Sequence, residues 1–185
     1  MRGEFAKKDT ARLRLTRPVP DDVPEVFTLY SDPAVWEHLP TGRHTDRAQT
    51  AVLIQRVLES WRAVHLGSWV ARDTRNTLVG MGGCDLRAGV AWNLGYRLAR
   101  NSWRQGFAAE IIEAAMAAAR AVRPELPITA FLLEHNVRSK AAAERAGLDL
   151  VWSGPDAGNP DPGAVRLVYS DRVLDAATVA RLARS

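Results

Sequence analysis

Cysteine is nearly absent from this 185-residue chain, in which Cys84 is the only one. A single thiol excludes an internal disulfide and leaves no cysteine-based metal site, which agrees with a reducing compartment. The chain has no apolar run of the roughly 20 residues that a membrane-spanning helix needs. Residues 1–9 also lack the apolar stretch of a secretion signal. These absences predict a cytoplasmic protein with no membrane partner and no metal.

The charge is close to balanced, with 25 basic and 21 acidic residues and a formal net charge of +4. The arginines are dispersed along the chain, which favours a solvated basic surface over a nucleic-acid groove. A hydrophobic fraction of 46% is ordinary for a globular protein, and the length suits one domain with its own core. We expect a disordered lead over residues 1–10 and a single domain over residues 11–185.

The most informative stretch covers residues 94–110 and reads as a strand, a turn and the start of a helix that continues to Val122. Gly106, Ala108 and Ala109 keep the helix entrance nearly free of side chains. The first N–H groups of a helix lack intrahelical partners and carry the positive end of the helix dipole, so an anion could dock there. A tight turn without a ligand is the alternative.

A second stretch follows a strand predicted at residues 128–133. Asn136 is placed to cap a helix and Gly147 to end it. Two strand-to-helix junctions in this order favour a ligand-binding site over an isolated tight turn without a ligand.

Together these stretches resemble the acetyl-CoA-binding core of the GNAT superfamily of N-acetyltransferases, in particular the branch of the RimJ/RimL ribosomal-protein N-terminal acetyltransferases. The family pattern is a strand ending in Gly-Tyr, a Trp-Gly-x-Gly-Tyr-Ala-type loop, a nearby Glu, and later Asn-x-x-Ser before a helix closing in Gly-Phe. The corresponding residues here are Gly95-Tyr96, Trp103-Arg104-Gln105-Gly106-Phe107-Ala108, Glu110, Asn136-x-x-Ser139 and Gly147-Leu148.

The rest of the chain agrees with this order of elements. Alternation and helical spacing predict strands at 11–17, 67–73, 77–86, 90–98, 128–133, 149–153 and 164–170, with helices near 21–30, 45–64, 107–122, 136–147 and 174–184. The resemblance implies an α/β GNAT fold: one mixed, mostly antiparallel twisted sheet of six to seven strands, flanked by about four helices. A splayed strand pair would form the acetyl-CoA site.

The resemblance also implies the chemistry, in which an amine attacks the thioester of acetyl-CoA directly and no metal takes part. In the family, the loop that corresponds to residues 103–109 holds the pyrophosphate. The pantetheine arm pairs with the strand end that corresponds to residues 96–99. A backbone N–H near Leu98 would face the developing oxyanion. The predicted cofactor-binding residues are Tyr96, Leu98, Ala99, Arg104, Gln105, Gly106, Phe107, Ala108, Ala109, Asn136 and Ser139.

The catalytic candidates are Ser139 and Glu110. Ser139 could protonate the leaving thiolate or be an ordinary first-turn serine, while Asn136 could cap the helix, contact the pantetheine, or do both. Many relatives carry a tyrosine where this chain has Ala143, which leaves Ser139 as the leading acid. The general base is open among Glu110, Asp85, His38 and His44, although the helix dipole also favours Glu110 at its position.

Residues tentatively assigned to the amine acceptor are Trp36, His38, Cys84 and Asp85, with core packing as the alternative for Cys84. The acceptor could be a protein N-terminus or a small-molecule amine, because the variable loops set specificity. A GNAT-like domain that binds acyl-CoA without turnover is the main alternative, a basic nucleic-acid-binding domain is a weaker one, and a homodimer is possible.

Overall fold

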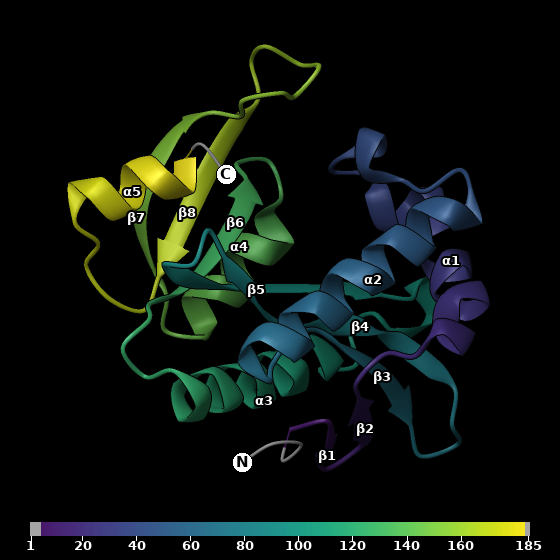
Figure 1. The fold of residues 1–185 in the computed structure, drawn as a ribbon. Helices are drawn as coiled ribbons and strands as arrows, with labels where there is room; N and C mark the ends of the chain where they lie inside the picture. The colour runs from purple at the N-terminus through teal and green to yellow at the C-terminus, as the bar shows by residue number, and fades with distance from the viewer. Residues whose placement is uncertain (1–4, 184–185) are drawn as a thin grey trace.

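The computed structural model describes residues 5–183 and shows a mixed α/β architecture built on one sheet (Figure 1). The strands are β1 (Lys7–Asp9), β2 (Leu13–Thr16), β3 (Trp69–Asp73), β4 (Leu78–Arg87), β5 (Ala91–Leu98), β6 (Ile128–Leu133), β7 (Asp149–Pro155) and β8 (Val165–Ser170). The α-helices are α1 (Val23–Ser31), α2 (Arg47–Val64), α3 (Phe107–Val122), α4 (Val137–Arg145) and α5 (Ala176–Ala183). Short 3-10 turns are η1 (Pro20–Asp22), η2 (Pro33–Trp36), η3 (Pro40–Gly42) and η4 (Arg100–Ser102).

The expected fold class is confirmed, although the described residues hold an eight-stranded sheet rather than one of six to seven strands. The additional strand is β1, which pairs antiparallel with β2 in the register Lys7 to Thr16. It lies inside residues 1–10, where the sequence predicts a disordered lead, while residues 1–4 lie outside the described residues. Its polar sequence carries no alternation, so its extended shape comes from pairing with β2.

The strand order is β1-β2-β3-β4-β5-β6-β8-β7, and the contact between β5 and β6 is the parallel one. These two strands pair only at Trp92 with Ile128 and Asn93 with Thr129. By contrast, β4 pairs with β5 as far as Leu98. The two strands therefore separate beyond Asn93, and the edge of β5 that faces β6 is left without a partner strand.

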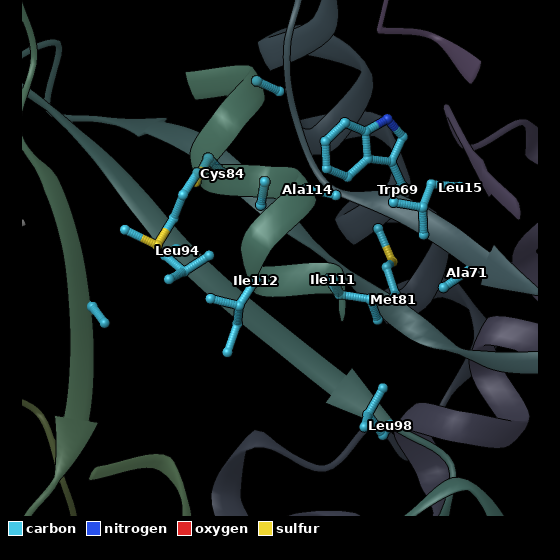
Figure 2. Close-up of a cluster of buried hydrophobic side chains, with 14 of the residues drawn as sticks. Leu15, Trp69, Ala71, Met81, Cys84, Leu94, Leu98, Ile111, Ile112 and Ala114 are labelled. Atoms are coloured by element: carbon cyan, nitrogen blue, oxygen red, sulfur yellow. The ribbon is translucent and has the colours of Figure 1, made fainter. Parts of the chain in front are cut away.

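Helix α3 covers one face of the central strands. Its buried side combines Ile111 and Ile112 with a row of alanines, and small side chains let a helix lie close to a sheet. Figure 2 shows both isoleucines in the same buried cluster as Cys84 and Leu94. Full burial of a side chain such as Ile111 contributes roughly 1.5–3 kcal/mol to the stability of the fold.

Helices α1 and α2 lie on the opposite face. Asp85 follows Cys84 on β4, and successive strand residues point to opposite faces. The Asp85 carboxylate accepts hydrogen bonds from Ser68, just after α2, whereas Cys84 belongs to the cluster beneath α3. The predicted start of α2 is confirmed, since the Asp46 carboxylate accepts from the Ala48 N–H at 2.9 Å. Among residues 5–183, no helix is long and apolar enough to cross a membrane.

Candidate functional site

A cavity of about 660 Å³ opens where the unpaired edge of β5 meets the starts of α3 and α4, and η2 closes its remaining side. Its walls are formed by Ala34, Val35, Glu37, His38, Tyr96, Arg97, Leu98, Ser102, Trp103, Arg104, Gly106, Phe107, Ala108, Ala109, His135, Asn136, Val137, Arg138, Ser139, Ala142 and Arg145. Four segments that are distant in sequence, namely η2, β5 and the starts of α3 and α4, therefore line the same cavity.

The β5 wall offers backbone donors. The Trp92 N–H donates to the Pro127 carbonyl at 2.8 Å, on the β6 side of the strand. Because backbone direction alternates along a strand, the N–H groups of Tyr96 and Leu98 point to the same side, beyond the last β6 pair. The Leu98 carbonyl accepts from Trp103 Nε1 at 2.9 Å, which fixes the turn that leaves β5. An extended ligand could therefore pair with this edge as an added strand.

The α3 wall offers a row of helical N–H groups. Gly106 occupies the N-cap position with φ of 82°, a conformation that glycine adopts without strain, and no side chain caps the helix. The first intrahelical bond runs from the Glu110 N–H to the Gly106 carbonyl at 3.3 Å, so the N–H groups of residues 107–109 lack intrahelical partners. This uncapped donor row beside small side chains fits a phosphate group.

Two hydroxyl groups line the cavity where α4 faces β5, that of Ser139 on α4 and that of Tyr96 on β5. Asn136 caps the helix by accepting from the Ser139 N–H at 3.2 Å, and both residues line the cavity. The Ser139 and Tyr96 side chains approach each other from α4 and β5. Burial raises the pKa of the Tyr96 phenol, although the Ser139 side chain and two nearby arginines offset part of that rise. Tyr96 therefore stays protonated at neutral pH.

Positive charge surrounds the same end of the cavity. Arg104, Arg138 and Arg145 all belong to its walls. The Arg138 guanidinium lies 5.2 Å from the centroid of the Trp103 ring, a cation–π contact that holds it beside the α3 turn. Three arginines near an uncapped helix start make this part of the cavity strongly attractive to phosphates.

The η2 side carries aromatic and imidazole groups. The Trp36 ring stacks on His38, with 6.2 Å between ring centroids, and His135 Nε2 donates to the His38 carbonyl at 2.8 Å. Burial lowers the pKa of His38 to about 4, and the charges of Arg97 and His135 act in the same direction. His38 is therefore neutral at pH 7.

Most predicted cofactor-binding residues line this cavity; Ala99 and Gln105 do not. The Ala99 N–H turns back to β4 and donates to the Val79 carbonyl at 2.9 Å. Gln105 also faces away, because its carbonyl accepts from Arg12 Nη1 at 2.7 Å and its side-chain amide donates to the Asn101 carbonyl at 2.7 Å. Of the two catalytic candidates, Ser139 lies on the cavity wall and Glu110 does not.

Glu110 is engaged elsewhere. Its carboxylate accepts from Thr10 and from the backbone and side chain of Arg12, outside the cavity. Of the tentative acceptor residues, His38 lines the cavity and Trp36 stacks beside it. The alternative reading of Cys84 as core packing fits the structure, because the thiol is fully buried and burial raises its pKa.

Two remaining base candidates also lie outside the cavity walls. The Asp85 carboxylate accepts hydrogen bonds from the Ser68 N–H at 3.0 Å and from the Ser68 hydroxyl at 2.6 Å. Burial raises the pKa of Asp85, although these hydrogen bonds lower it in part. The His44 ring is held at the start of α2, with Nδ1 2.8 Å from the Thr50 hydroxyl. Within residues 5–183, no group of three His, Cys, Asp or Glu side chains could hold a metal ion.

Among the cavity residues that were not predicted from the sequence as site residues are Arg97, Arg138, Arg145 and His135. A local signal existed for two of them, since Arg138 and Arg145 are seven residues apart and so share one face of a helix that starts at the site. For Arg97 there was no local signal, because its surroundings come from η2 and α1.

Comparison with protein families matches residues 12–149 to the acetyltransferase (GNAT) domain family. No curated protein sequence matches the chain. Among solved structures, a GNAT-family protein from Bordetella pertussis superposes with a TM-score of 0.77 at 18% identity, covering 90% of this chain and 99% of its own.

Two ribosomal-protein acetyltransferases superpose almost as closely. The Salmonella typhimurium enzyme that modifies the N-terminal serine of ribosomal protein L7/L12 gives a TM-score of 0.72 at 18% identity, with coverages of 90% and 97%. A RimL L7/L12 acetyltransferase in complex with coenzyme A gives 0.72 at 20% identity, with coverages of 90% and 97%. At such identities these similarities establish the fold.

Proposed function

This chain belongs to the GNAT acetyltransferase family, and on that premise we propose that it transfers the acetyl group of acetyl-CoA to a primary amine by direct attack on the thioester. One observation carries the proposal. The free donor edge of β5 and the uncapped start of α3 open into the same cavity, so one extended molecule with a phosphate group can satisfy both.

Each part of the co-substrate has matching groups on the walls. The N–H groups of residues 107–109, with Arg104, bind the pyrophosphate. Tyr96 and Leu98 pair with the pantetheine arm through their backbone, and the Asn136 side chain contacts the same arm from the α4 side. Arg138 and Arg145 supply further positive charge for phosphate oxygens. Acetyl-CoA itself supplies the activated acetyl group.

Two groups assist the transfer. The Leu98 N–H points into the gap between β5 and β6 and donates to the thioester oxygen as negative charge develops on it. The Ser139 and Tyr96 hydroxyls, which both lie on the cavity wall, deliver a proton to the leaving thiolate. Many relatives carry a tyrosine on α4 at the position of Ala143, which is a buried alanine here. The tyrosine that lines this cavity is Tyr96, and it comes from β5.

No carboxylate is assigned as general base. Glu110 is tied to Arg12 outside the cavity, and His38, with a pKa of about 4, is too weakly basic to keep a proton at pH 7. The ammonium form of the acceptor loses its proton to water, and we assign His38 the role of accepting a hydrogen bond from the resulting uncharged amine. The reaction is then expected to speed up with pH until the acceptor amine is fully deprotonated.

The acceptor is a primary amine of one of two classes. The RimL neighbours favour a protein N-terminal amine, such as that of a ribosomal protein, and a small-molecule amine is the other candidate. The proposal also takes residues 11–185 as one catalytic domain, acting in the cytoplasm. The lone reduced cysteine supports that setting.

The test combines thermal unfolding with acetyl-CoA, CoA and longer acyl-CoAs and a free-thiol release assay over a panel of amines and N-terminal peptides. Stabilisation by acetyl-CoA together with thiol release on an amine is the expected result. Stabilisation without release from any amine would support a non-catalytic acyl-CoA-binding domain instead. Absence of stabilisation would contradict the assignment of the cavity.

A further inference from the structure

Arg97 is a buried cation with almost nothing to pair with. Its Nη1 donates to the Tyr96 carbonyl at 3.1 Å, and its guanidinium carbon lies 4.3 Å from the centroid of the Trp36 ring. Its Nε is buried without any hydrogen-bond partner among the described residues. Burial lowers the pKa of its guanidinium, and no carboxylate of residues 5–183 offsets that effect.

A second unpaired donor lies beside it. The Trp36 indole Nε1 is also buried without a hydrogen-bond partner within residues 5–183. Burying a polar group without a partner is costly, and burying an unpaired charge is more so. Of the two residues, only Arg97 lines the cavity, so Arg97 is the one that a ligand bringing oxygen acceptors can approach.

Another arginine of the same sheet shows the contrast. Arg72 on β3 lies 3.0 Å from an Asp22 oxygen and 2.6 Å from a Glu25 oxygen, and its side chain is 16% exposed. The fold therefore supplies carboxylates to Arg72 but leaves Arg97 without one, on the wall of the cavity. Such a group fits a role in binding an anion that arrives with a ligand.

The position of Arg97 indicates which ligand this is. Its backbone stands between Tyr96 and Leu98, whose N–H groups face the proposed thioester position. Its side chain points to the other face of the strand, toward Trp36 and His38. An anion held there would belong to the amine acceptor rather than to the phosphates of the co-substrate, which are assigned to the α3 end of the cavity. Guanidinium groups bind carboxylates in a planar, two-point geometry.

We propose that the acceptor carries a carboxylate a few bonds from its reacting amine, held by the Arg97 guanidinium on the cavity wall. This rests on the proposed acetyl transfer. The carboxylate can come from a free α-amino acid or from an acidic side chain near the N-terminus of a peptide. In either case the anion offsets the Arg97 charge, which would otherwise repel an approaching ammonium group.

The experiment compares acceptors that differ only in the carboxylate. Free alanine is tested against alanine amide, and peptides beginning Asp-Ala against Asn-Ala, by thiol release with wild type, Arg97→Gln and Arg97→Lys. A hydrogen bond to a charged group corresponds to about a tenfold to hundredfold preference in kcat/KM for the acidic member. Arg97→Gln should abolish that preference and Arg97→Lys should keep part of it. The pair of acceptors that shows the preference identifies the source of the carboxylate.

The control variant is Arg75→Gln, which removes the charge of an 85% exposed arginine in the β3–β4 turn and should retain the wild-type preference. Arg97→Gln is expected to fold, because replacing a buried unpaired charge by a neutral group relieves a desolvation cost. Equal rates on acidic and neutral acceptors in wild type would overturn the inference. So would an equal loss on both in Arg97→Gln, which indicates a structural role.

A binding measurement separates this inference from the proposed function. Calorimetric titration of N-acetylglutamate and its diamide into the CoA-saturated protein needs no turnover. Preferential binding of the acid that disappears in Arg97→Gln would support the anion site even if no amine is acetylated. Acetyl transfer without any such preference in binding or in rate would leave the proposed function standing and contradict the anion site.

Discussion

The Glu110 carboxylate accepts hydrogen bonds from the backbone N–H of Arg12 at 2.8 Å and from its Nε at 3.0 Å. A third bond runs from Arg12 Nη1 to the Gln105 carbonyl at 2.7 Å. The segment between β1 and β2 is thereby fastened to the first turn of α3 and to the residue before Gly106. Glu110 thus supports the shape of the anion-binding turn from behind instead of facing the cavity.

The hydrogen bonds between Arg12 and Glu110 are predicted to stabilise the fold without taking part in catalysis. Glu110→Gln should lower the free energy of unfolding by about 1–2 kcal/mol, because hydrogen bonds to a charged acceptor are lost on a partly exposed pair. It should leave kcat within a few-fold, whereas loss of a general base costs about 10²–10⁴. Urea unfolding and steady-state kinetics test both statements, with the exposed Glu113→Gln of the next turn as control. A hundredfold loss of kcat would restore Glu110 as a catalytic group.

The same pair predicts a pH dependence. Desolvation opposes ionisation of Glu110, but hydrogen bonds from Thr10 and Arg12 outweigh it and hold its pKa below the ordinary value of 4.5. A group with a lowered pKa contributes stability above its unfolded pKa and loses it as pH falls through the folded one. The stability difference between wild type and Glu110→Gln should therefore shrink below about pH 4.5. A constant difference down to pH 3 would contradict this account.

The Gly106 position allows a test with two nearly isosteric variants. Asn and Asp both tolerate positive φ and both cap helices, so Gly106→Asn and Gly106→Asp should fold with similar melting temperatures. A Cβ at this position would lie 3.2 Å from Arg12 Nη2, and the aspartate adds a negative charge within one turn of the N–H groups proposed to bind the pyrophosphate. We expect Gly106→Asp to weaken acetyl-CoA binding at least about tenfold more than Gly106→Asn does, as measured by calorimetry. Equal affinities would contradict the placement of the phosphates at α3.

Sequence reasoning succeeded where the signal is local. The limits of β6 and of α2 agree with the structure because alternation, helical period and the Asp46 cap act within a few residues. The phosphate site proposed at residues 103–109 also depends on a local feature, since the N–H groups of one helix start form it. β1 was missed because Lys7-Lys8-Asp9 becomes extended only by pairing with β2.

Sequence alone does not reveal the surroundings of residues whose partners are distant in the chain. Glu110 matches a family position, yet its partner Arg12 lies 98 positions away in sequence. Whether Cys84 or Asp85 faces the core depends on strand register, and a shift of one residue exchanges the two. The unusual feature of Arg97 is the lack of a carboxylate around it, and only the packed structure can reveal that.

The Tyr96 and Ser139 hydroxyls give a prediction about proton delivery. Tyr96→Phe and Ser139→Ala should each lower kcat by about tenfold or more, and the double variant should lose little beyond the worse single one, because the two hydroxyls act as one unit. Tyr169→Phe is the matched control, since its hydroxyl bonds to Glu144 at 3.1 Å away from the cavity walls. Fully additive losses would indicate that the hydroxyls act separately, and unchanged rates would remove both from the mechanism.

The lowered pKa of His38 predicts how the stability of the protein depends on acid. Burial, aided by the charges of Arg97 and His135, lowers this pKa from 6.5 to about 4 in the folded state. Between those values the unfolded chain binds more protons than the folded one, so protonation favours unfolding as pH falls. Wild type should lose stability relative to His38→Gln from about pH 6.5 downward, and the difference should level off below about pH 4. Melting temperatures of both proteins at pH 7.5, 5.5 and 4 measure the effect. A difference that stays constant across this range would show that His38 titrates equally in both states, and would remove the physical basis for keeping it neutral beside the acceptor amine.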